Sequence, residues 1–133
     1  MSKIQYRDGY KYQLAKEYQH VTDIFGFEID TEFIALNKTG LLTIKRGYAW
    51  NGASGPTVDT KSSIRGSLVH DALYQLMGID HRLYPFRLYA DELFHLICRE
   101  DGMGAIRSWL WKKAVNIFGE GAASTQDEIK EAP

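Results

Sequence analysis

The order of apolar and polar residues divides the chain into a β-rich first half and a helical second half. Between residues 10 and 50, apolar side chains recur at every second position in short runs, which is the period of strands with one buried face. The residues of segment 37–40, Asn-Lys-Thr-Gly, favour a hairpin turn between 33–36 and 41–45. We therefore expect a small antiparallel sheet, with the clearest alternation at Tyr10, Tyr12, Leu14, Leu42 and Ile44.

From about residue 60 to residue 118, apolar residues spaced three and four apart predict three helices. Helices commonly end at a glycine in the left-handed conformation, and they commonly begin at a hydroxyl side chain that caps the first amides or at a proline in the first turn. The expected ends are Gly78, Gly102 and Gly119, and the helices are expected to start near Ser62 or Ser63, near Pro85 and around Gly104.

The fold class that follows is α+β, with a small N-terminal antiparallel sheet followed by a three-helix C-terminal half. The chain has 133 residues, and a domain of this size buries roughly two thirds of the surface of its unfolded chain. We expect a single α+β domain over residues 1–119. Residues 120–133 are polar and acidic, and we expect them to form a tail that buries little by itself.

Composition restricts the class of protein further. Hydrophobic residues make up 44% and aromatic residues 13% of the chain, which favours a globular protein over a disordered one. The formal net charge of -1 argues against nucleic acid as a partner. The single cysteine, Cys98, excludes an intrachain disulfide, and its apolar helical surroundings predict a place in the core. We find neither a signal peptide nor a membrane-spanning run, which predicts synthesis into the cytoplasm.

The candidate chemistry lies in the helical half. His70 and Tyr74 are four residues apart and share a helix face, while Asp71 lies about 100° round the same helix. A second helix packed antiparallel brings Asp91 to the imidazole, and we expect His70 Nδ1 to lie within hydrogen-bond reach of Asp91. An imidazole oriented by one carboxylate, beside a second carboxylate that can hold a cation, is a general-base arrangement. The alternative is a polar network that only joins the two helices.

A second notable segment precedes the helices. Residues 47–56, Gly-Tyr-Ala-Trp-Asn-Gly-Ala-Ser-Gly-Pro, are rich in small side chains and turn formers. The backbone carbonyls of such a segment can converge on a cation. The alternative is a strand exit followed by an ordinary turn.

The order of these features resembles the phospholipase A2 pattern, including the compact phospholipase domains of some viral capsid proteins. The resemblance rests on the small-residue loop, on His-Asp-x-x-Tyr at 70–74 and on the distal Asp91. It implies that His70 is the base that activates a water, that Asp71 binds calcium, and that Asp91 orients His70 and accepts a hydrogen bond from Tyr74. It further implies that the loop supplies an amide that stabilises the oxyanion, together with calcium-binding carbonyls from Asn51, Gly52, Ser54 and Gly55.

The chain departs from that pattern in two respects. Pro56 removes one backbone donor from the loop, and the paired cysteines that brace the secreted phospholipases are absent. The two helices that carry the candidate site therefore have to be fixed by packing alone. The apolar residues expected to do this are Leu68, Leu73, Leu76, Leu93, Phe94 and Ile97.

A broader resemblance covers about residues 41–119 and is to a family of phage and prophage proteins labelled domain of unknown function 1353. The family label implies a phage origin and no reaction. The matching motifs are Gly-Ala-Ser-x-Pro at 52–56, His-Asp-x-x-Tyr at 70–74, Ala-Asp-x-x-Phe at 90–94, and a segment from Trp109-Leu110 to Phe118-Gly119.

Two further sets of residues have alternative interpretations. His20, His81 and His95 together with the His-Asp pair suggest a metal-dependent phosphohydrolase, although His20 lies in a predicted strand or loop and His95 is expected to face solvent. The tryptophans and a basic face on the third helix suggest a lipid-binding surface, whereas core packing and a solvated helix face explain them equally well. These residues are Trp50, Trp109, Trp111, Arg107, Lys112 and Lys113.

The leading functional hypothesis is a phage-encoded ester hydrolase with a calcium-assisted, phospholipase A2-like site. The first alternative is a non-enzymatic virion component, such as a tail or tail-tip protein, that uses the same residues as a buried network. The second alternative is a host-directed binding or inhibitor module. The expected partners are a phospholipid or membrane surface or other virion proteins, and the expected location is the host cytoplasm on synthesis, with later association with the virion.

Overall fold

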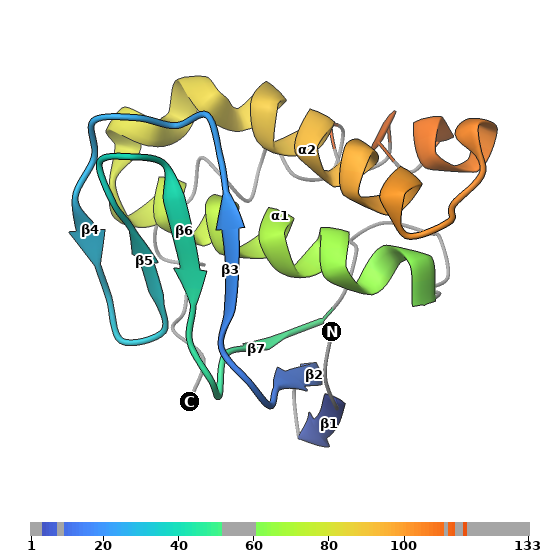
Figure 1. The fold of residues 1–133 in the computed structure, drawn as a ribbon, viewed down its shortest axis with the longest axis horizontal. Coiled ribbons are helices and arrows are strands. Elements are labelled where there is room, and N and C mark those ends of the chain that lie inside the picture. Colours follow the sequence, from blue (N-terminus) through green and yellow to red (C-terminus); the bar gives the residue numbers. More distant parts are fainter. Residues whose placement is uncertain (1–3, 8–9, 52–60, 111, 114–115, 117–133) are drawn as a thin grey trace. The chain divides into compact units, whose positions relative to one another are not determined.

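A computed structural model describes residues 4–7, 10–51, 61–110, 112–113 and 116 (Figure 1). The described residues form two compact units, with the boundary after Asn51. The first unit contains all the described strands, and the second contains the described helices. This arrangement confirms the predicted α+β class, with antiparallel sheets before helices in the chain.

The first unit contains two antiparallel sheets rather than one. The three-stranded sheet has the order β1-β2-β7 and the four-stranded sheet has the order β3-β6-β5-β4. The three-stranded sheet is formed by β1 (Ile4–Arg7), β2 (Tyr10–Leu14) and β7 (Ala49–Trp50). The four-stranded sheet is formed by β3 (Tyr18–Val21), β4 (Ile29–Asp30), β5 (Ile34–Leu36) and β6 (Leu41–Ile44).

The predicted alternation in the strands has the expected packing consequence. Leu42 and Ile44 on β6 are fully buried and lie opposite Leu36 and Ile34 on β5, so the apolar side chains of both strands lie on one face of the sheet. Thr43, between them in the chain, is less buried. The alternating pattern therefore identified the core face of the four-stranded sheet correctly.

The predicted hairpin turn joins β5 to β6. The Asn37 side-chain oxygen accepts hydrogen bonds from the backbone amides of Thr39 and Leu41, which is the usual way in which asparagine closes a turn. Gly40 has a φ angle of 90°, and a Cβ atom there would lie 2.3 Å from the backbone oxygen of Thr22. Only glycine fits this position without strain.

The second unit begins with α1 (Lys61–Ile79), continues through the 3-10 helix η1 (His81–Phe86) and then forms α2 (Arg87–Glu100). A third helix is described at residues 105–110, with further helical residues at 112, 113 and 116. The colours of Figure 1 show that α1 and α2 run antiparallel, side by side. Within the described ranges, no helix is long and apolar enough to cross a membrane.

Two of the expected helix ends can be compared with the structure. Gly102 has a φ angle of 99° and ends α2 as predicted. The prediction that Gly78 ends the first helix in a left-handed conformation was wrong, because α1 includes Gly78 and continues to Ile79. Asp80 then adopts an extended conformation, and its side chain accepts a hydrogen bond from the Arg82 amide, so η1 begins with a cap.

The second helix begins near Pro85 as predicted, but the proline is not in its first turn. Pro85 lies inside η1, and α2 begins two residues later, at Arg87. Gly119 and the tail at 120–133 lie outside the described residues. The single domain over residues 1–119 stays a prediction.

The apolar residues that the sequence predicted to fix α1 and α2 are buried. Cys98 is fully buried, and burial raises the pKa of its thiol to about 12, so it is a protonated packing residue. The other buried residues predicted for this contact are Leu68, Leu73, Leu76, Leu93, Phe94 and Ile97.

Gly66 sets how closely the two helices approach. A Cβ atom at this position would lie 2.9 Å from Cys98 Sγ and 3.2 Å from the backbone oxygen of Phe94. For Gly66→Ala, overpacking costs about 1–3 kcal/mol, while the better helix propensity of alanine recovers up to about 1 kcal/mol. We expect a net loss of about 1 kcal/mol in the free energy of unfolding, measured by urea denaturation.

Gly104→Ala is the matched control, because nothing lies within 4 Å of a Cβ atom at Gly104. We expect this variant to change stability by less than about 0.5 kcal/mol. Equal stabilities for the two variants would contradict a close helix approach at Gly66.

Candidate active site

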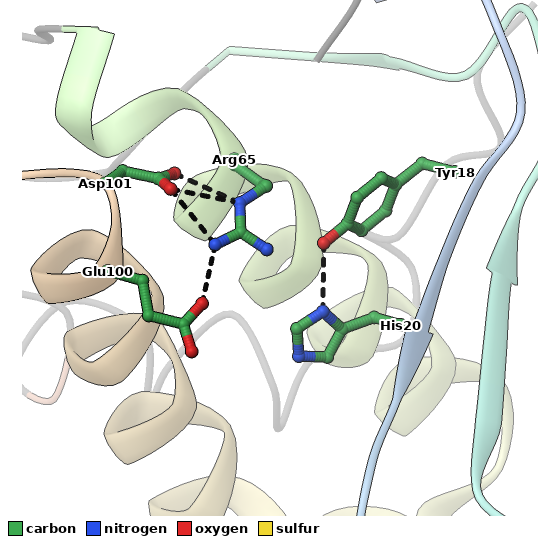
Figure 2. Close-up of polar contacts among 5 residues, drawn as sticks. All are labelled: Tyr18, His20, Arg65, Glu100 and Asp101. Carbon is green, nitrogen blue, oxygen red and sulfur yellow. Dashed lines mark hydrogen bonds and ion pairs between the residues drawn. The ribbon is translucent and has the colours of Figure 1, made fainter.

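The candidate site is built across the contact between α1 and α2. His70 and Tyr74 are one helical turn apart on α1, and Asp91 lies on α2. At the other end of the same helix pair, the Arg65 guanidinium bridges the carboxylates of Glu100 and Asp101 (Figure 2). This contact joins the start of α1 to the end of α2 and helps to fix the register in which His70 faces Asp91.

The three predicted catalytic side chains are in direct contact. His70 Nε2 lies 2.6 Å from Asp91 Oδ1, and the Tyr74 hydroxyl donates a hydrogen bond of 2.7 Å to the same oxygen. The rings of His70 and Tyr74 are 4.2 Å apart between centroids, and the Phe94 ring meets the His70 ring edge-on. The imidazole is therefore held by one carboxylate and two aromatic rings.

The prediction was wrong about which ring nitrogen of His70 contacts Asp91. We expected Nδ1 of His70 to contact Asp91, but Nε2 makes this contact. Nδ1 instead lies 3.7 Å from Asp71 Oδ1, too far for a direct hydrogen bond. When Nε2 carries the proton and donates it to Asp91, Nδ1 retains a lone pair on the side of the ring near Asp71.

The site is buried, and this changes the basicity of the imidazole. The exposed fraction is 6% for His70 and 1% for Asp91, while the Asp71 side chain is partly exposed. Burial by itself lowers the pKa of His70, but the interactions with the carboxylates of Asp71 and Asp91 outweigh it, so the pKa lies above the ordinary value of 6.5. Burial and the hydrogen bond to Asp91 also raise the pKa of Tyr74, which therefore remains a proton donor.

Sequence reasoning missed Arg87. Its guanidinium Nη1 lies 3.7 Å from Asp91 Oδ2, a buried oxygen with no hydrogen-bond partner among the described residues. The side chain of Arg87 is mostly buried, and its positive charge partly balances that of the Asp91 carboxylate. The available signal was the spacing of four residues between Arg87 and Asp91, which places oppositely charged side chains on one helix face.

The predicted calcium site is only partly described. Asp71 lies beside His70 as expected, and Asn51 is an exposed residue at the end of the first unit. Gly52, Ser54 and Gly55 lie outside the described residues. In the described part of the chain, no group of three His, Cys, Asp or Glu side chains is placed to hold a metal ion. The convergence of loop carbonyls on Asp71 stays a prediction.

The other histidines have contacts of their own. On β3, the His20 ring nitrogen Nδ1 is hydrogen-bonded to the Tyr18 hydroxyl at 2.9 Å (Figure 2). His81 is exposed in η1. The expectation that His95 faces solvent was wrong, because His95 is partly buried and its Nδ1 is hydrogen-bonded to the Ser108 hydroxyl of the third helix. The phosphohydrolase alternative draws no further support from these contacts.

The fold and site define an α+β protein with a His-Asp-Tyr site on a pair of antiparallel helices. No protein-family model matches the chain, and neither does any curated protein or solved structure. The resemblances to phospholipase A2 and to domain of unknown function 1353 therefore rest on the motifs in the sequence.

Proposed function

We propose that this chain is a phage-encoded ester hydrolase in which His70 activates a water molecule. The observation that carries the proposal is the 2.6 Å contact of His70 Nε2 with Asp91, which holds the imidazole and leaves Nδ1 as the nitrogen that can accept a proton. A general base needs such an orientation together with a pKa near neutrality. Phospholipid is the proposed substrate class, by resemblance to phospholipase A2.

The reaction begins with neutral His70, whose Nε2–H donates to Asp91. Nδ1 takes a proton from water as the water oxygen forms a bond to the ester carbonyl carbon. The resulting imidazolium is stabilised by the Asp91 carboxylate, and the Tyr74 hydroxyl bond keeps that carboxylate in place. When the tetrahedral intermediate collapses, the bond to the leaving alcohol breaks and His70 Nδ1 returns its proton to the alcohol oxygen.

Calcium is proposed as the cofactor by the same resemblance, with Asp71 as the side-chain ligand. When bound, a calcium ion polarises the ester carbonyl. Asp71 provides one hard oxygen ligand, whereas calcium takes 6–8 oxygen ligands as a rule. The remaining protein ligands would have to come from outside the described residues, so the steps above use only His70, Asp91 and Tyr74.

The test is release of fatty acid from phospholipid vesicles by the wild type and by His70→Ala, each with calcium or with a chelator. Loss of the general base should reduce the rate on the order of a hundredfold or more. The calcium proposal further predicts that the chelator lowers the wild-type rate and leaves the residual rate of the variant unchanged. His81→Ala is the matched control, since His81 is an exposed histidine of η1.

Circular dichroism and thermal unfolding of each variant establish that the chain remains folded. Equal rates for the wild type and a folded His70→Ala variant would eliminate the hydrolase proposal. A chelator-insensitive wild type that still depends on His70 would eliminate calcium alone.

Burial of His70 and Asp91 favours a second candidate function. In this alternative the chain is a non-enzymatic virion component, such as a tail or tail-tip protein, and the same residues form a network that fixes how the helices pack. Mass spectrometry of purified particles tests it. A chain absent from the particles would contradict this candidate.

A further inference from the structure

Two described residues of the third helix, Ser108 and Lys112, make polar contacts with α2. Ser108 is fully buried and its hydroxyl is hydrogen-bonded to His95 of α2. One turn later, Lys112 Nζ lies 2.8 Å from the Glu92 carboxylate of α2. Among the described residues of this helix, the two that bond to α2 are both polar.

The apolar side of the same helix faces outward. The exposed fraction is 78% for Ile106, 49% for Trp109 and 52% for Leu110. These three residues and Lys113 share one face, because they are spaced three, four and seven residues apart. We call this set, Ile106, Trp109, Leu110 and Lys113, the outward stripe. A cluster of exposed large apolar residues indicates a surface that meets another apolar phase or partner.

The charges around the outward stripe identify what it meets. The segment 104–118 contains no acidic residue, and of its three basic residues Lys112 is paired with Glu92 of α2, whereas Arg107 and Lys113 add positive charge to the helix. Lys113 Nζ lies 5.4 Å from the centre of the Trp109 ring, within the range of a cation–π interaction. A second copy of the chain would bring basic helices together, so like charges oppose self-association through this stripe. The complementary surface is therefore apolar and negatively charged.

We propose that the outward stripe binds the surface of an anionic phospholipid membrane. Tryptophan and lysine have apolar bodies and polar ends, which suits both to the boundary between headgroups and acyl chains. Ile106 and Leu110 enter the acyl region, Trp109 lies at its edge, and Lys113 meets the anionic headgroups. Binding of this kind is independent of the hydrolysis proposed for His70, because none of these residues contributes to that site.

The test is co-sedimentation of the full chain with vesicles of phosphatidylcholine alone or of phosphatidylcholine with phosphatidylglycerol. We expect binding to the anionic vesicles only, weakening as salt screens the charges. Ile106→Ser should weaken binding roughly tenfold, and Lys113→Gln should weaken it roughly fivefold. Both positions are exposed, so each variant should keep the wild-type melting temperature.

Two controls localise and separate the effect. Val21→Ser removes an aliphatic side chain of similar exposure, 75%, from β3 and should bind as the wild type does. His70→Ala should also bind normally, so failure of the hydrolase proposal leaves this result intact. The proposal is overturned by equal binding to neutral vesicles, by undiminished binding of both stripe variants, or by an equal loss in Val21→Ser.

Absence of binding to anionic vesicles would overturn the proposal as well. Sedimentation equilibrium then shows what binds the outward stripe. A dimer that the Ile106→Ser variant abolishes would identify a second copy as the occupant, and a monomer would indicate an acidic protein partner instead.

Discussion

Replacing Asp91 with alanine is expected to lower the free energy of unfolding by about 3–5 kcal/mol, which is the usual cost of removing one partner of a buried charged network. The reason is that Asp91 Oδ1 accepts from both His70 and Tyr74. Removing the carboxylate leaves these two buried donors without their acceptor and removes the negative charge beside Arg87. Urea denaturation monitored by circular dichroism measures the loss.

The matched control is Glu92→Ala, one residue along α2. Glu92 is half-exposed and pairs with Lys112, so its loss should cost no more than about 1 kcal/mol. Asp91→Asn keeps the volume of the side chain and one acceptor oxygen. Its loss in the free energy of unfolding should therefore lie between the losses of Asp91→Ala and Glu92→Ala. A loss at Asp91 as small as that at Glu92 would show that the network contributes little to stability.

The rate of ester hydrolysis is expected to rise steeply with pH through the raised pKa of His70. Only the neutral imidazole accepts a proton from water, and its pKa lies above 6.5. Below that pKa, kcat/KM should fall about tenfold for each pH unit. The value of kcat/KM at about pH 5 should therefore be more than tenfold below its value on the high-pH plateau. A profile of kcat/KM against pH measures this, and a flat profile across that range would contradict His70 as the base.

Deprotonation of His70 should raise the rate of hydrolysis but lower the contribution of His70 to the free energy of unfolding. The pKa of His70 is raised in the folded state, so its contribution to stability is fully present below 6.5 and is lost as pH rises through the folded-state pKa. The difference in unfolding free energy between the wild type and His70→Gln should therefore shrink with rising pH. Asp71, Asp91 and Tyr74 are the ionisable side chains that face the ring. A difference that grows with pH would contradict the raised pKa.

The local features of this protein could be predicted because each depends on residues close in the chain. The turn at Asn37 and Gly40 follows from asparagine hydrogen bonding and glycine geometry, and the structure has both. Likewise, the spacing of four between His70 and Tyr74 places them on one helix face whatever surrounds the helix. Two buried rows of apolar residues then predict that the helices pack together. The contact with Asp91 follows once they pack antiparallel.

Other features depend on atoms that only the folded chain brings together. The sequence contains nothing that decides which nitrogen of His70 meets Asp91, because that depends on the rotation of the imidazole between Tyr74 and Phe94. Gly78 has the residue type of a helix end, yet α1 continues past it because Asp80 caps the next turn instead. Local propensity was overridden there by the connection to η1.

The His-Asp-Tyr pattern on two helices was thus determined by the sequence alone, through helix periodicity and the burial of apolar rows. Tertiary structure decided the buried state of the site, the place of Arg87 beside Asp91 and the raised pKa of His70. It also decided that Ile106, Trp109 and Leu110 of the third helix face outward. Periodicity specifies which residues share a face, but the contacts with α2 determine which face is buried.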